Sequence, residues 1–424
     1  MKDPGRHFPR YTTYEPRVPV WCLTPDTPGC IHRFFDTCPL SPSGRYLAVF
    51  QLPVEDRQPT PGEKGTVRVV DLETGKNTIV SETRGWEPQM GANINWGGSD
   101  NELFFNDVDT ETWQPFAWKL DPQTGKKKKM EGTVYHASPD GRWLISSNLT
   151  RTRKTQPGYG VVVPEETVPW RRGAPDDDGF YLTDTRTGKR SLFASVRELL
   201  TVPDPAVGIS PDDDIEISGF HSKFNARGTR LMLSLRWFQA ADRPLWDMFK
   251  NGKPGSVRFA WVTADLQKKR LHCAVGPEEW AKGGHHATWF PDGERISMNL
   301  KIDRDIMRFV QVNADGTGYG KILDNAVGSG HPTLNPHSPH ILTDTYTHES
   351  ASFGDGTIPL RWIRLEDGTE ETLVRINTRT GCEDGVMRVD PHPAWDRQWR
   401  YVVFNAFEGG TRRVYIADMC TIKE

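Results

Sequence analysis

Hydrophobic and polar residues alternate along much of the chain in short segments, a pattern typical of half-buried β-strands. In residues 67–76, Val67, Val69 and Val70 lead into the turn Asp71-x-x-Thr74-Gly75. This arrangement predicts two antiparallel strands joined by a tight hairpin. Related segments occur at 118–126, 181–189 and 309–318, and looser ones at 261–268, 362–368 and 413–418.

A second motif precedes each of these segments. Its clearest copy is Ser138-Pro139-Asp140-Gly141, followed by an apolar run, where proline and glycine supply the dihedral angles of a turn between strands. Copies of decreasing clarity lie at 138–145, 290–296, 40–47, 225–231, 98–104, 395–401 and 335–341. Seven units of about four strands predict an all-β fold, a seven-bladed β-propeller.

The repeats also predict the domain organisation. A length of 424 residues alone favours about three domains, but a repeat that runs through the chain favours one propeller domain over residues 1–424. The apolar segment at 17–23 precedes the first repeat, and we expect it to complete the last blade and close the ring. Two insertions, at about 150–179 and 236–256, interrupt the period, and we expect both to lie as loops over one face.

Composition narrows the function classes. The formal net charge is −3, so nothing in the charge balance favours nucleic acid or an anionic membrane as a partner. No apolar run approaches the roughly 20 residues needed to span a bilayer. Residues 1–7 contain no apolar segment of a signal peptide, so we expect a cytoplasmic protein. The oligomeric state is not predicted.

Histidines occupy a fixed phase of the repeat. His221, His286, His331 and His392 each lie seven residues before the turn position of their blade, and Asn93 has the same phase. His136 lies five residues before its turn, and His32 has a longer spacing. Because one phase maps to one level of the ring, we expect six histidines at one mouth of the central channel. The alternative is a structural consensus in which each imidazole bonds to the neighbouring blade.

Several short segments resemble the oligogalacturonate lyases. They are Thr12-Thr13-Tyr14, Leu23-Thr24-Pro25, Cys30-Ile31-His32-Arg33-Phe34-Phe35, Gly284-His285-His286, Gly330-His331 and Asp390-Pro391-His392-Pro393. Related propeller lyases of ulvan, and propeller enzymes that act on rhamnose-capped glucuronate, share this layout. The resemblance therefore implies a propeller enzyme whose substrate is a uronate-containing oligosaccharide or polysaccharide.

The resemblance also implies a metal site. In the oligogalacturonate lyases three histidines and a glutamine hold a divalent metal, and His331 and His392 match two of these histidines. Asp390 stands in place of the third histidine and Met387 in place of the glutamine. Imidazole and carboxylate together suit Mn, Fe, Zn or Ni. We expect a divalent metal, with Mn²⁺ favoured and Ca²⁺ or no metal as alternatives, held by His286, His331, Asp390 and His392.

β-Elimination next to a uronate needs a base at C5, an acid for the leaving O4 oxygen, and a group that neutralises the carboxylate. We expect His221 or His32 as the base, and Arg236 or Arg33 as a carboxylate clamp. Sugar-binding candidates are Tyr159, Trp170, Trp237 and His136.

Two other functions fit the same sequence. One is a glycoside hydrolase that removes rhamnose from glucuronate, and the other is a non-catalytic, TolB-like binding scaffold, because propellers carry many functions. A lyase product absorbs ultraviolet light through its new C4–C5 double bond, whereas a hydrolase product does not.

Overall fold

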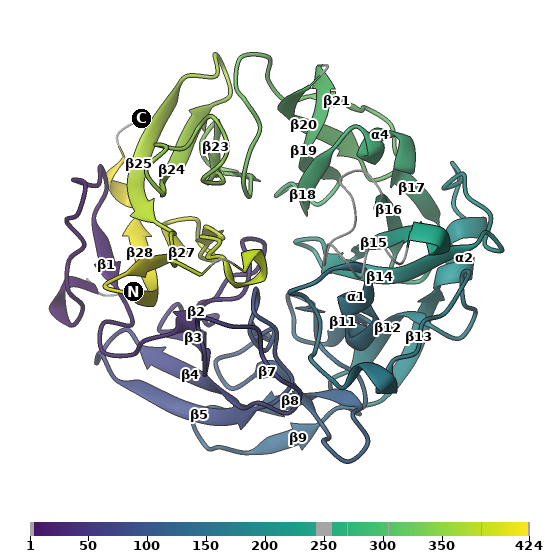
Figure 1. Ribbon diagram of the computed structural model, residues 1–424. Coiled ribbons are helices and arrows are strands. Elements are labelled where there is room, and N and C mark those ends of the chain that lie inside the picture. The colour runs from purple at the N-terminus through teal and green to yellow at the C-terminus, as the bar shows by residue number, and fades with distance from the viewer. Residues whose placement is uncertain (1–3, 243–256, 269, 304, 383, 423–424) are drawn as a thin grey trace.

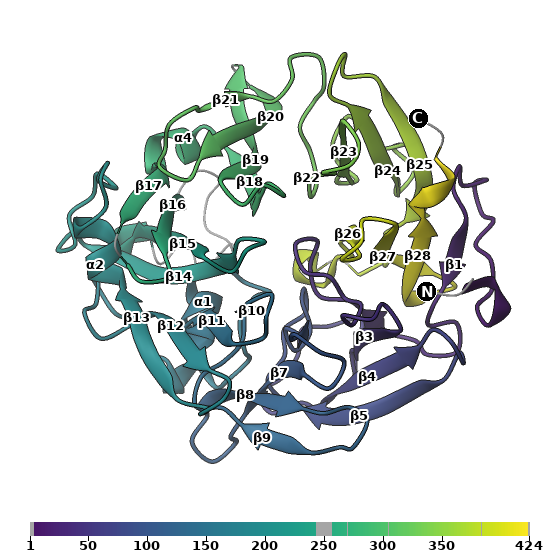
Figure 2. The same ribbon diagram turned by 180° about the vertical axis from the view of Figure 1, so that it is seen from behind.

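Seven antiparallel sheets of four strands each surround a central axis in the computed structural model, which describes residues 4–242, 257–268, 270–303, 305–382 and 384–422 (Figure 1). The seven-bladed β-propeller predicted from the repeats is confirmed. In each blade the first strand along the repeat lies nearest the axis, as the positions of β10, β18, β22 and β26 in Figure 2 show.

The strands of the first three blades come in chain order. They are β2 (Cys30–Ile31), β3 (Tyr46–Gln51), β4 (Gly65–Asp71) and β5 (Asn77–Thr83); β6 (Asn95–Trp96), β7 (Leu103–Val108), β8 (Pro115–Leu120) and β9 (Lys127–Lys129); and β10 (His136–Ala137), β11 (Trp143–Ser147), β12 (Gly179–Asp184) and β13 (Arg190–Ser195).

The next three blades have the same order. They are β14 (Ile215–Phe224), β15 (Arg230–Gln239), β16 (Arg258–Asp265) and β17 (Leu271–Val275); β18 (Gly284–Trp289), β19 (Arg295–Asp303), β20 (Ile306–Asn313) and β21 (Gly320–Lys321); and β22 (Thr333–Leu334), β23 (His340–Thr343), β24 (Thr357–Arg364) and β25 (Glu370–Asn377).

The seventh blade closes the ring with a strand from the other end of the chain. It consists of β26 (Ala394–Trp395), β27 (Tyr401–Glu408), β28 (Thr411–Asp418) and β1 (Val20–Cys22). Strand β1 pairs with β28 in antiparallel register, with Val20 opposite Ala417 and Cys22 opposite Tyr415. The prediction that the N-terminal strand completes the last blade is therefore confirmed.

Short helices lie between strands. The described α-helices are α1 (Leu149–Thr155), α2 (Val196–Thr201) and α4 (Pro277–Ala281), and the 3₁₀ turns are Pro4–Arg6, Glu165–Thr167, Ala240–Asp242, Gly385–Met387 and Met419–Thr421. No helix among the described residues is long and apolar enough to cross a membrane.

Tryptophans at the ends of three inner strands bond each blade to the one before it. The Nε1 hydrogen of Trp96 is donated to Pro39 O at 2.9 Å, that of Trp289 to Lys223 O at 3.2 Å, and that of Trp395 to Thr333 Oγ1 at 3.1 Å. These bonds satisfy the buried indole N–H groups of the three residues. They also fix how the apolar faces of neighbouring blades align.

Residues 33–37 leave the first blade and cross the channel. Phe34 and Phe35 are fully buried there, and Arg33 donates to Asn93 Oδ1 in the second blade and to Tyr135 O before the third. Asp36 pairs with Lys223 of the fourth blade at 2.6 Å. This segment, called the axial plug below, explains the longer spacing of His32 in its repeat.

The insertion at 150–179 begins with α1 and continues across the ring. The amide of Gly160 donates to Glu87 between the first two blades, and Val161, Val163 and Val168 pack in one apolar cluster with Phe34 and Phe35. It therefore contacts both the axial plug and the connection between the first two blades. Most of the second insertion, residues 243–256, lies outside the described residues, but β15 runs on to Gln239, so the start of that insertion at 236 was placed too early.

Candidate active site

Four of the predicted histidines surround the ring of Phe34. The ring centroid of Phe34 lies 4.6 Å from that of His392, 5.2 Å from His221, 5.7 Å from His331 and 6.2 Å from His286. His32 joins the group through His392, at 6.4 Å between centroids. The shared phase of the repeat therefore brings side chains from blades far apart in sequence to one level of the channel.

The backbone is strained at this level. His286 and His392 have φ angles of +58° and +50°, in the left-handed region that residues other than glycine rarely adopt, and Asn93, at the same phase, has φ +52°. Such conformations cost about 1–3 kcal/mol each and persist only where the surrounding structure enforces them, commonly at functional sites. Strain at one repeated position is an independent indication that this level of the channel is a site.

His331 is held by a carboxylate. Its Nδ1 lies 2.9 Å from both oxygens of Asp344, and its amide donates to Asp344 Oδ1 at 2.7 Å. Both side chains are buried. Because Nδ1 donates its hydrogen to Asp344, the lone pair of His331 is on Nε2, and this atom has no hydrogen-bond partner among the described residues.

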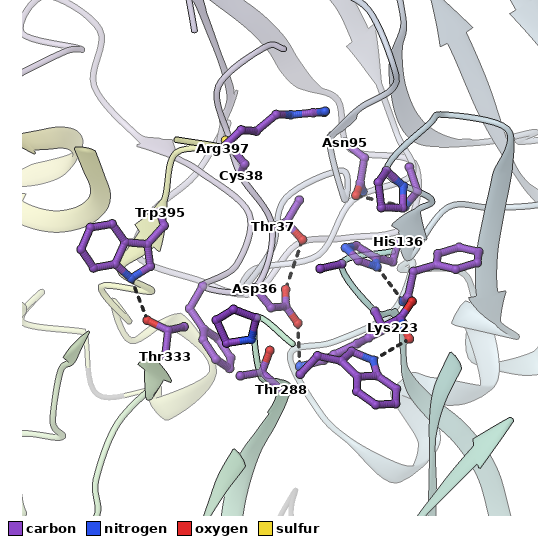
Figure 3. Close-up of a pocket in the computed structure, with 18 of the residues that line it drawn as sticks. Asp36, Thr37, Cys38, Asn95, His136, Lys223, Thr288, Thr333, Trp395 and Arg397 are labelled. Carbon is purple, nitrogen blue, oxygen red and sulfur yellow. Dashed lines mark hydrogen bonds and ion pairs between the residues drawn. The ribbon is translucent and has the colours of Figure 1, made fainter. Parts of the chain in front are cut away.

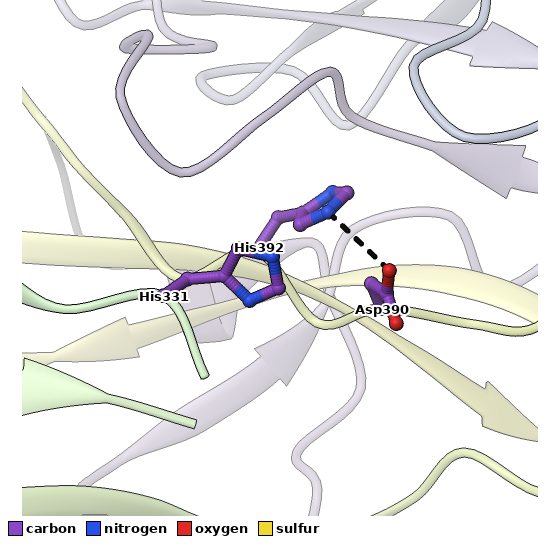
Figure 4. A group of neighbouring side chains, drawn as sticks. All are labelled: His331, Asp390 and His392. Atoms are coloured by element: carbon purple, nitrogen blue, oxygen red, sulfur yellow. Dashed lines mark ion pairs between the residues drawn. The ribbon is translucent and has the colours of Figure 1, made fainter. Parts of the chain in front are cut away.

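His331, Asp390 and His392 form one buried group, shown in Figure 4. One potential ligand atom from each residue lies within 4.8 Å of the other two, and His392 Nε2 is 3.9 Å from Asp390 Oδ2. Neither ring nitrogen of His392 has a hydrogen-bond partner within the described part of the chain. Burial holds the pKa of His392 well below its usual value, so its imidazole is neutral.

These three residues fit a divalent metal. Three equally spaced ligand atoms about 2.1 Å from an ion lie at most about 3.6 Å apart, so atoms as far as 4.8 Å apart would need to approach by about 1 Å. A buried imidazole nitrogen with no partner costs free energy that a metal would recover. A carboxylate oriented behind His331 is the usual second layer of a metal site. Met387 is buried, and its carbonyl accepts a hydrogen bond from Arg412.

His286 was predicted to be a metal ligand but lies in a different arrangement. Its Nδ1 donates to Gly330 O at 2.7 Å, and its Nε2 faces the hydroxyl of Tyr346 at 3.4 Å. The ring stacks on His331 with centroids 3.8 Å apart, but it is not part of the group of three. Burial raises the pKa of Tyr346 and lowers that of His286, so a neutral phenol faces a neutral imidazole.

An open cavity of about 590 Å³ adjoins this group. It lies between the connection that follows β23 and the segment that joins β25 to β26, and Tyr346, Arg388 and Asp390 line it. Arg388 pairs with Asp390 at 2.9 Å, and its side chain is partly exposed. The cavity therefore gives solvent and small ligands a guanidinium beside the metal-ligand candidates.

The predicted bases do not line this cavity. His221 is enclosed by the rings of Phe34, Tyr135, Tyr159 and Phe220, and burial lowers its pKa well below the usual value. His32 has a pKa lowered to about 3 by burial, and its Nε2 lies 3.3 Å from Pro391 O. Both are neutral and in contact with the site, but Phe34 separates His221 from the group of three.

The predicted carboxylate clamps are structural instead. Arg33 is buried in the axial plug, where it bonds to Asn93, Thr37, Asp36 and Tyr135. Arg236 does not head a loop as predicted: it lies in β15, buried over the ring of Phe259, and donates its Nε hydrogen to Thr155 O. Burial lowers the pKa of Arg236 to about 9.

The predicted sugar-stacking aromatics have three different positions. Trp237 is only 2% exposed and packs in the core between the third and fourth blades, so the prediction for it was wrong. Trp170 packs on Phe238 and under Lys154. Tyr159, from the insertion, is buried over Phe220 with its hydroxyl against Arg388, so it contacts the site without exposing a face to a sugar.

His136 lies at the opposite end of the channel, contrary to the prediction of one shared mouth. Its Nδ1 accepts the amide hydrogen of Phe224 at 2.9 Å, and it lines a second cavity of about 390 Å³ together with Asp36 and Lys223 (Figure 3). The rings of Phe34 and Phe35 lie between this cavity and the other histidines.

The sequence reasoning missed three residues of the site: Asp344, Tyr346 and Arg388. The first two follow β23, in the connection to β24, which lies outside the repeated turn motifs and so gave no signal. Arg388 had one available signal. It lies two residues before Asp390, in the same short segment as His392.

No protein-family profile and no curated protein sequence matches this chain. Among solved structures, an oligogalacturonate lyase from Vibrio parahaemolyticus aligns with a TM-score of 0.60 and 15% identity, over 97% of this chain and 96% of that one. An oligogalacturonate lyase in complex with manganese aligns with a TM-score of 0.62 and 15% identity, over the same shares of the two chains. The resemblance expected from the short motifs is thus confirmed for the architecture, and the chain has the seven-bladed propeller fold of the oligogalacturonate lyases.

Proposed function

We propose that this protein is an oligosaccharide lyase that cleaves next to a uronic acid by β-elimination. The observation that carries the proposal is the buried group of His331, Asp390 and His392, with unpaired imidazole nitrogens, beside an open cavity lined by Arg388 and Tyr346. The shared fold supports it, since the solved structures of that fold named above are oligogalacturonate lyases.

His331, Asp390 and His392 would hold a divalent metal, with Mn²⁺ as the first candidate because one of the aligned lyases is a manganese complex. When bound, the metal supplies positive charge beside the uronate carboxylate and makes the C5 hydrogen more acidic. Asp344 contacts Nδ1 of His331, so the lone pair on Nε2 points away from Asp344 and is available to the metal.

Arg388 is the proposed carboxylate-binding residue. Its guanidinium has five N–H groups; Asp390 engages Nε and Nη2, and Gly385 O accepts from Nη1 at 3.2 Å. The Tyr159 hydroxyl engages a fourth, and one N–H group remains for a substrate carboxylate. Arg388 thus takes the role that the sequence assigned to Arg33 or Arg236.

His286 and Tyr346 are the proposed base and acid. His286 holds a lone pair on Nε2 and accepts the C5 proton as the C4–O4 bond breaks, and the C4–C5 double bond forms. Tyr346 donates its phenolic proton to the leaving O4 oxygen. The proton on His286 then returns to Tyr346 across their 3.4 Å contact, which restores both groups. This assignment replaces His221 and His32, because His286 faces the hydroxyl of Tyr346 whereas His221 is enclosed by aromatic rings and Nε2 of His32 lies against Pro391 O.

Ultraviolet absorbance of unsaturated uronates tests the function. Oligogalacturonides, ulvan and rhamnose-capped glucuronides are each incubated with the protein, with EDTA or with added Mn²⁺. We expect absorbance to rise with at least one uronate glycan and EDTA to abolish the rise. Release of rhamnose without absorbance would establish the hydrolase, and no product from any substrate would favour a binding scaffold.

A matched pair of variants connects the activity to the site. His392→Ala should abolish the absorbance change, while His340→Ala, at the start of β23 and stacked on Trp362, should leave it unchanged. Equal activity of both variants would exclude the proposed metal group.

A further inference from the structure

We propose that the cavity of about 390 Å³ at the opposite end of the channel is a binding site for a neutral sugar. His136 and Thr288 bond to the sugar hydroxyls, and the aromatic wall packs against the sugar ring. The rings of Phe34 and Phe35 separate this cavity from the candidate active site, so the inference does not depend on the proposed lyase activity.

The innermost strands of six blades and the axial plug build this cavity. Strands β6, β10, β14, β18, β22 and β26 each contribute a side chain, and Phe35 and Asp36 of the plug line its inner end (Figure 3). Pro139, Ala226 and Arg397 are exposed, so the cavity opens to solvent. Its volume is near the lower end of the roughly 300–1,000 Å³ of small-ligand sites, which suits one sugar ring better than a longer chain.

Aromatic side chains form much of the wall. They are Trp96, Phe224, Trp289, Phe290, Trp395 and Trp399. Trp289 and Trp399 are partly exposed, and the Nε1 hydrogen of Trp289 is already donated to Lys223 O at 3.2 Å. What Trp289 offers a ligand is therefore ring carbon. The C–H groups on one face of a pyranose ring pack well on such an electron-rich aromatic surface.

The charged groups at the inner end of the cavity are paired within the protein. Asp36 accepts from Lys223 at 2.6 Å and from Arg33 at 3.2 Å, and Lys223 also donates to Ala287 O at 2.7 Å. A charged ligand therefore meets no unpaired partner there.

The charged groups nearer the opening are bonded as well. Asp396 accepts from the amides of Arg400 and Tyr401, and Arg397 donates to Gly97 O at 2.9 Å. The lining thus has two carboxylates, Asp36 and Asp396, and two cations, Lys223 and Arg397. Because these charges balance, the cavity favours a neutral ligand.

His136 presents a hydrogen-bond donor to the cavity. Its Nδ1 accepts the amide hydrogen of Phe224 at 2.9 Å, and burial lowers the pKa of His136 to about 3, so the ring is neutral and its hydrogen is on Nε2. Thr288, on β18, adds a hydroxyl that can donate and accept. In the described part of the chain, neither Nε2 of His136 nor the Thr288 hydroxyl has a hydrogen-bond partner.

Sugar hydroxyls match these two groups. One hydroxyl accepts from Nε2 of His136, and a second exchanges hydrogen bonds with Thr288, which leaves the ring face to the aromatic wall. An apolar ligand would leave the donor of His136 unsatisfied, at a cost in free energy. A carboxylate would accept that hydrogen but would lack a free cation beside it.

Calorimetric titration of the full chain tests the proposal. The neutral probes are D-galactose, D-glucose, D-mannose and L-rhamnose, the charged probe is D-galacturonate, and we expect millimolar affinity for at least one neutral sugar. His136→Asn keeps an acceptor for the Phe224 amide but loses the Nε2 donor, and it should weaken binding about tenfold, the order for one hydrogen bond. Thr288→Val keeps the shape without the hydroxyl and should weaken binding similarly.

Two controls establish where the sugar binds. His337→Asn, at an exposed position outside this cavity, should bind the sugar as the unmodified protein does. Arg388→Gln and added EDTA should also leave the affinity unchanged, because they alter only the candidate active site on the other side of the plug.

Each other outcome overturns the proposal. Binding of no neutral sugar does so, as does equal affinity in the unmodified, His136→Asn and Thr288→Val proteins. Weakening by Arg388→Gln alone would place the sugar in the candidate active site. Galacturonate binding tighter than galactose, and lost in His136→Asn, would make this an anion site. If His136→Asn fails to fold, Thr288→Val decides, since it removes no hydrogen bond within the described residues.

Discussion

Asp344 holds His331 by two contacts, one to the ring Nδ1 at 2.9 Å and one to the backbone amide at 2.7 Å. The carboxylate thereby fixes both the ring and the loop that carries it, and Gly330, immediately before, has no room for a side chain because a β-carbon would lie 2.2 Å from Asp344 O. Asp344, which does not line the cavity, therefore determines the orientation of His331, the proposed metal ligand.

Substitution of Asp344 should affect metal binding before it affects folding. In Asp344→Asn the amide competes as a donor and no longer enforces the tautomer with a hydrogen on Nδ1. We expect Mn²⁺ affinity to fall about 10- to 100-fold, the usual effect of removing such a partner. Calorimetry with Mn²⁺ alone measures it, and Asp367→Asn, in an exposed turn, is the control. Equal Mn²⁺ affinity in the two variants would refute the assigned role.

Tyr346→Phe should slow the chemical step while substrate and metal still bind. The variant removes only the hydroxyl that faces His286, so kcat should fall about 10²- to 10⁴-fold, the range for loss of a general acid, with KM little changed. Steady-state absorbance kinetics measure both constants. Tyr319→Phe, whose hydroxyl bonds to Glu279 at the surface, should keep full activity. A rise in KM at constant kcat would instead indicate a binding role.

Glu87 predicts a pH dependence of stability. It is buried, accepts from Asn93 and the Gly160 amide, and burial raises its pKa from 4.5 to about 8. Between these values the folded protein keeps a proton that the unfolded chain releases, so this contribution to stability is complete below about pH 4.5 and is lost as pH rises through about 8. The slope reaches at most about 1.4 kcal/mol per pH unit.

Glu87→Gln should remove this slope, since glutamine stays neutral. Urea unfolding at each pH measures the free energy of unfolding of both proteins. The variant should gain stability relative to the unmodified protein between pH 5 and pH 8.5. Glu111→Gln, in an exposed turn, should show no such crossover. Parallel stability curves for the Glu87→Gln and unmodified proteins would show that Glu87 is ionised in the folded state.

Phe34→Ala should destabilise the ring strongly. Phe34 is fully buried and contacts histidines of four blades, so its removal leaves a cavity on the axis. We expect a loss of about 3–5 kcal/mol in the free energy of unfolding, as for other buried phenylalanines. Ile79→Ala, at an exposed position of β5, should cost far less. Similar losses for the two variants in chemical denaturation would contradict a structural role for the axial plug.

Repeats made the fold predictable from sequence. Each turn motif, such as Ser138-Pro139-Asp140-Gly141, encodes its dihedral angles locally, and ring closure follows because the first blade is preceded by one extra strand. Helix α2 begins after Ser195, which is its N-cap and accepts a hydrogen bond from Glu198 N. Helix α1 lay inside an insertion with no periodic signal and was not predicted.

The position of each histidine relative to its turn motif predicted part of the site. The prediction failed for residues whose spacing to that motif differs from the others. His136 lies two residues closer to its turn than the other histidines, which along a strand moves it about 7 Å toward the opposite mouth. Arg33 follows His32 directly, but the five extra residues of that repeat carry it into the plug. Tyr346 and Asp344 come from a connection between strands, whose position depends on tertiary contacts that one blade does not specify.

The axial plug has a consequence for how a long glycan is handled. With the rings of Phe34 and Phe35 across the bore and Asp36 bonded to Lys223 below them, a polymer has no passage through the ring. A glycan chain therefore cannot pass through the central channel. If the proposed function holds, a glycan chain would have to enter and leave by the same face.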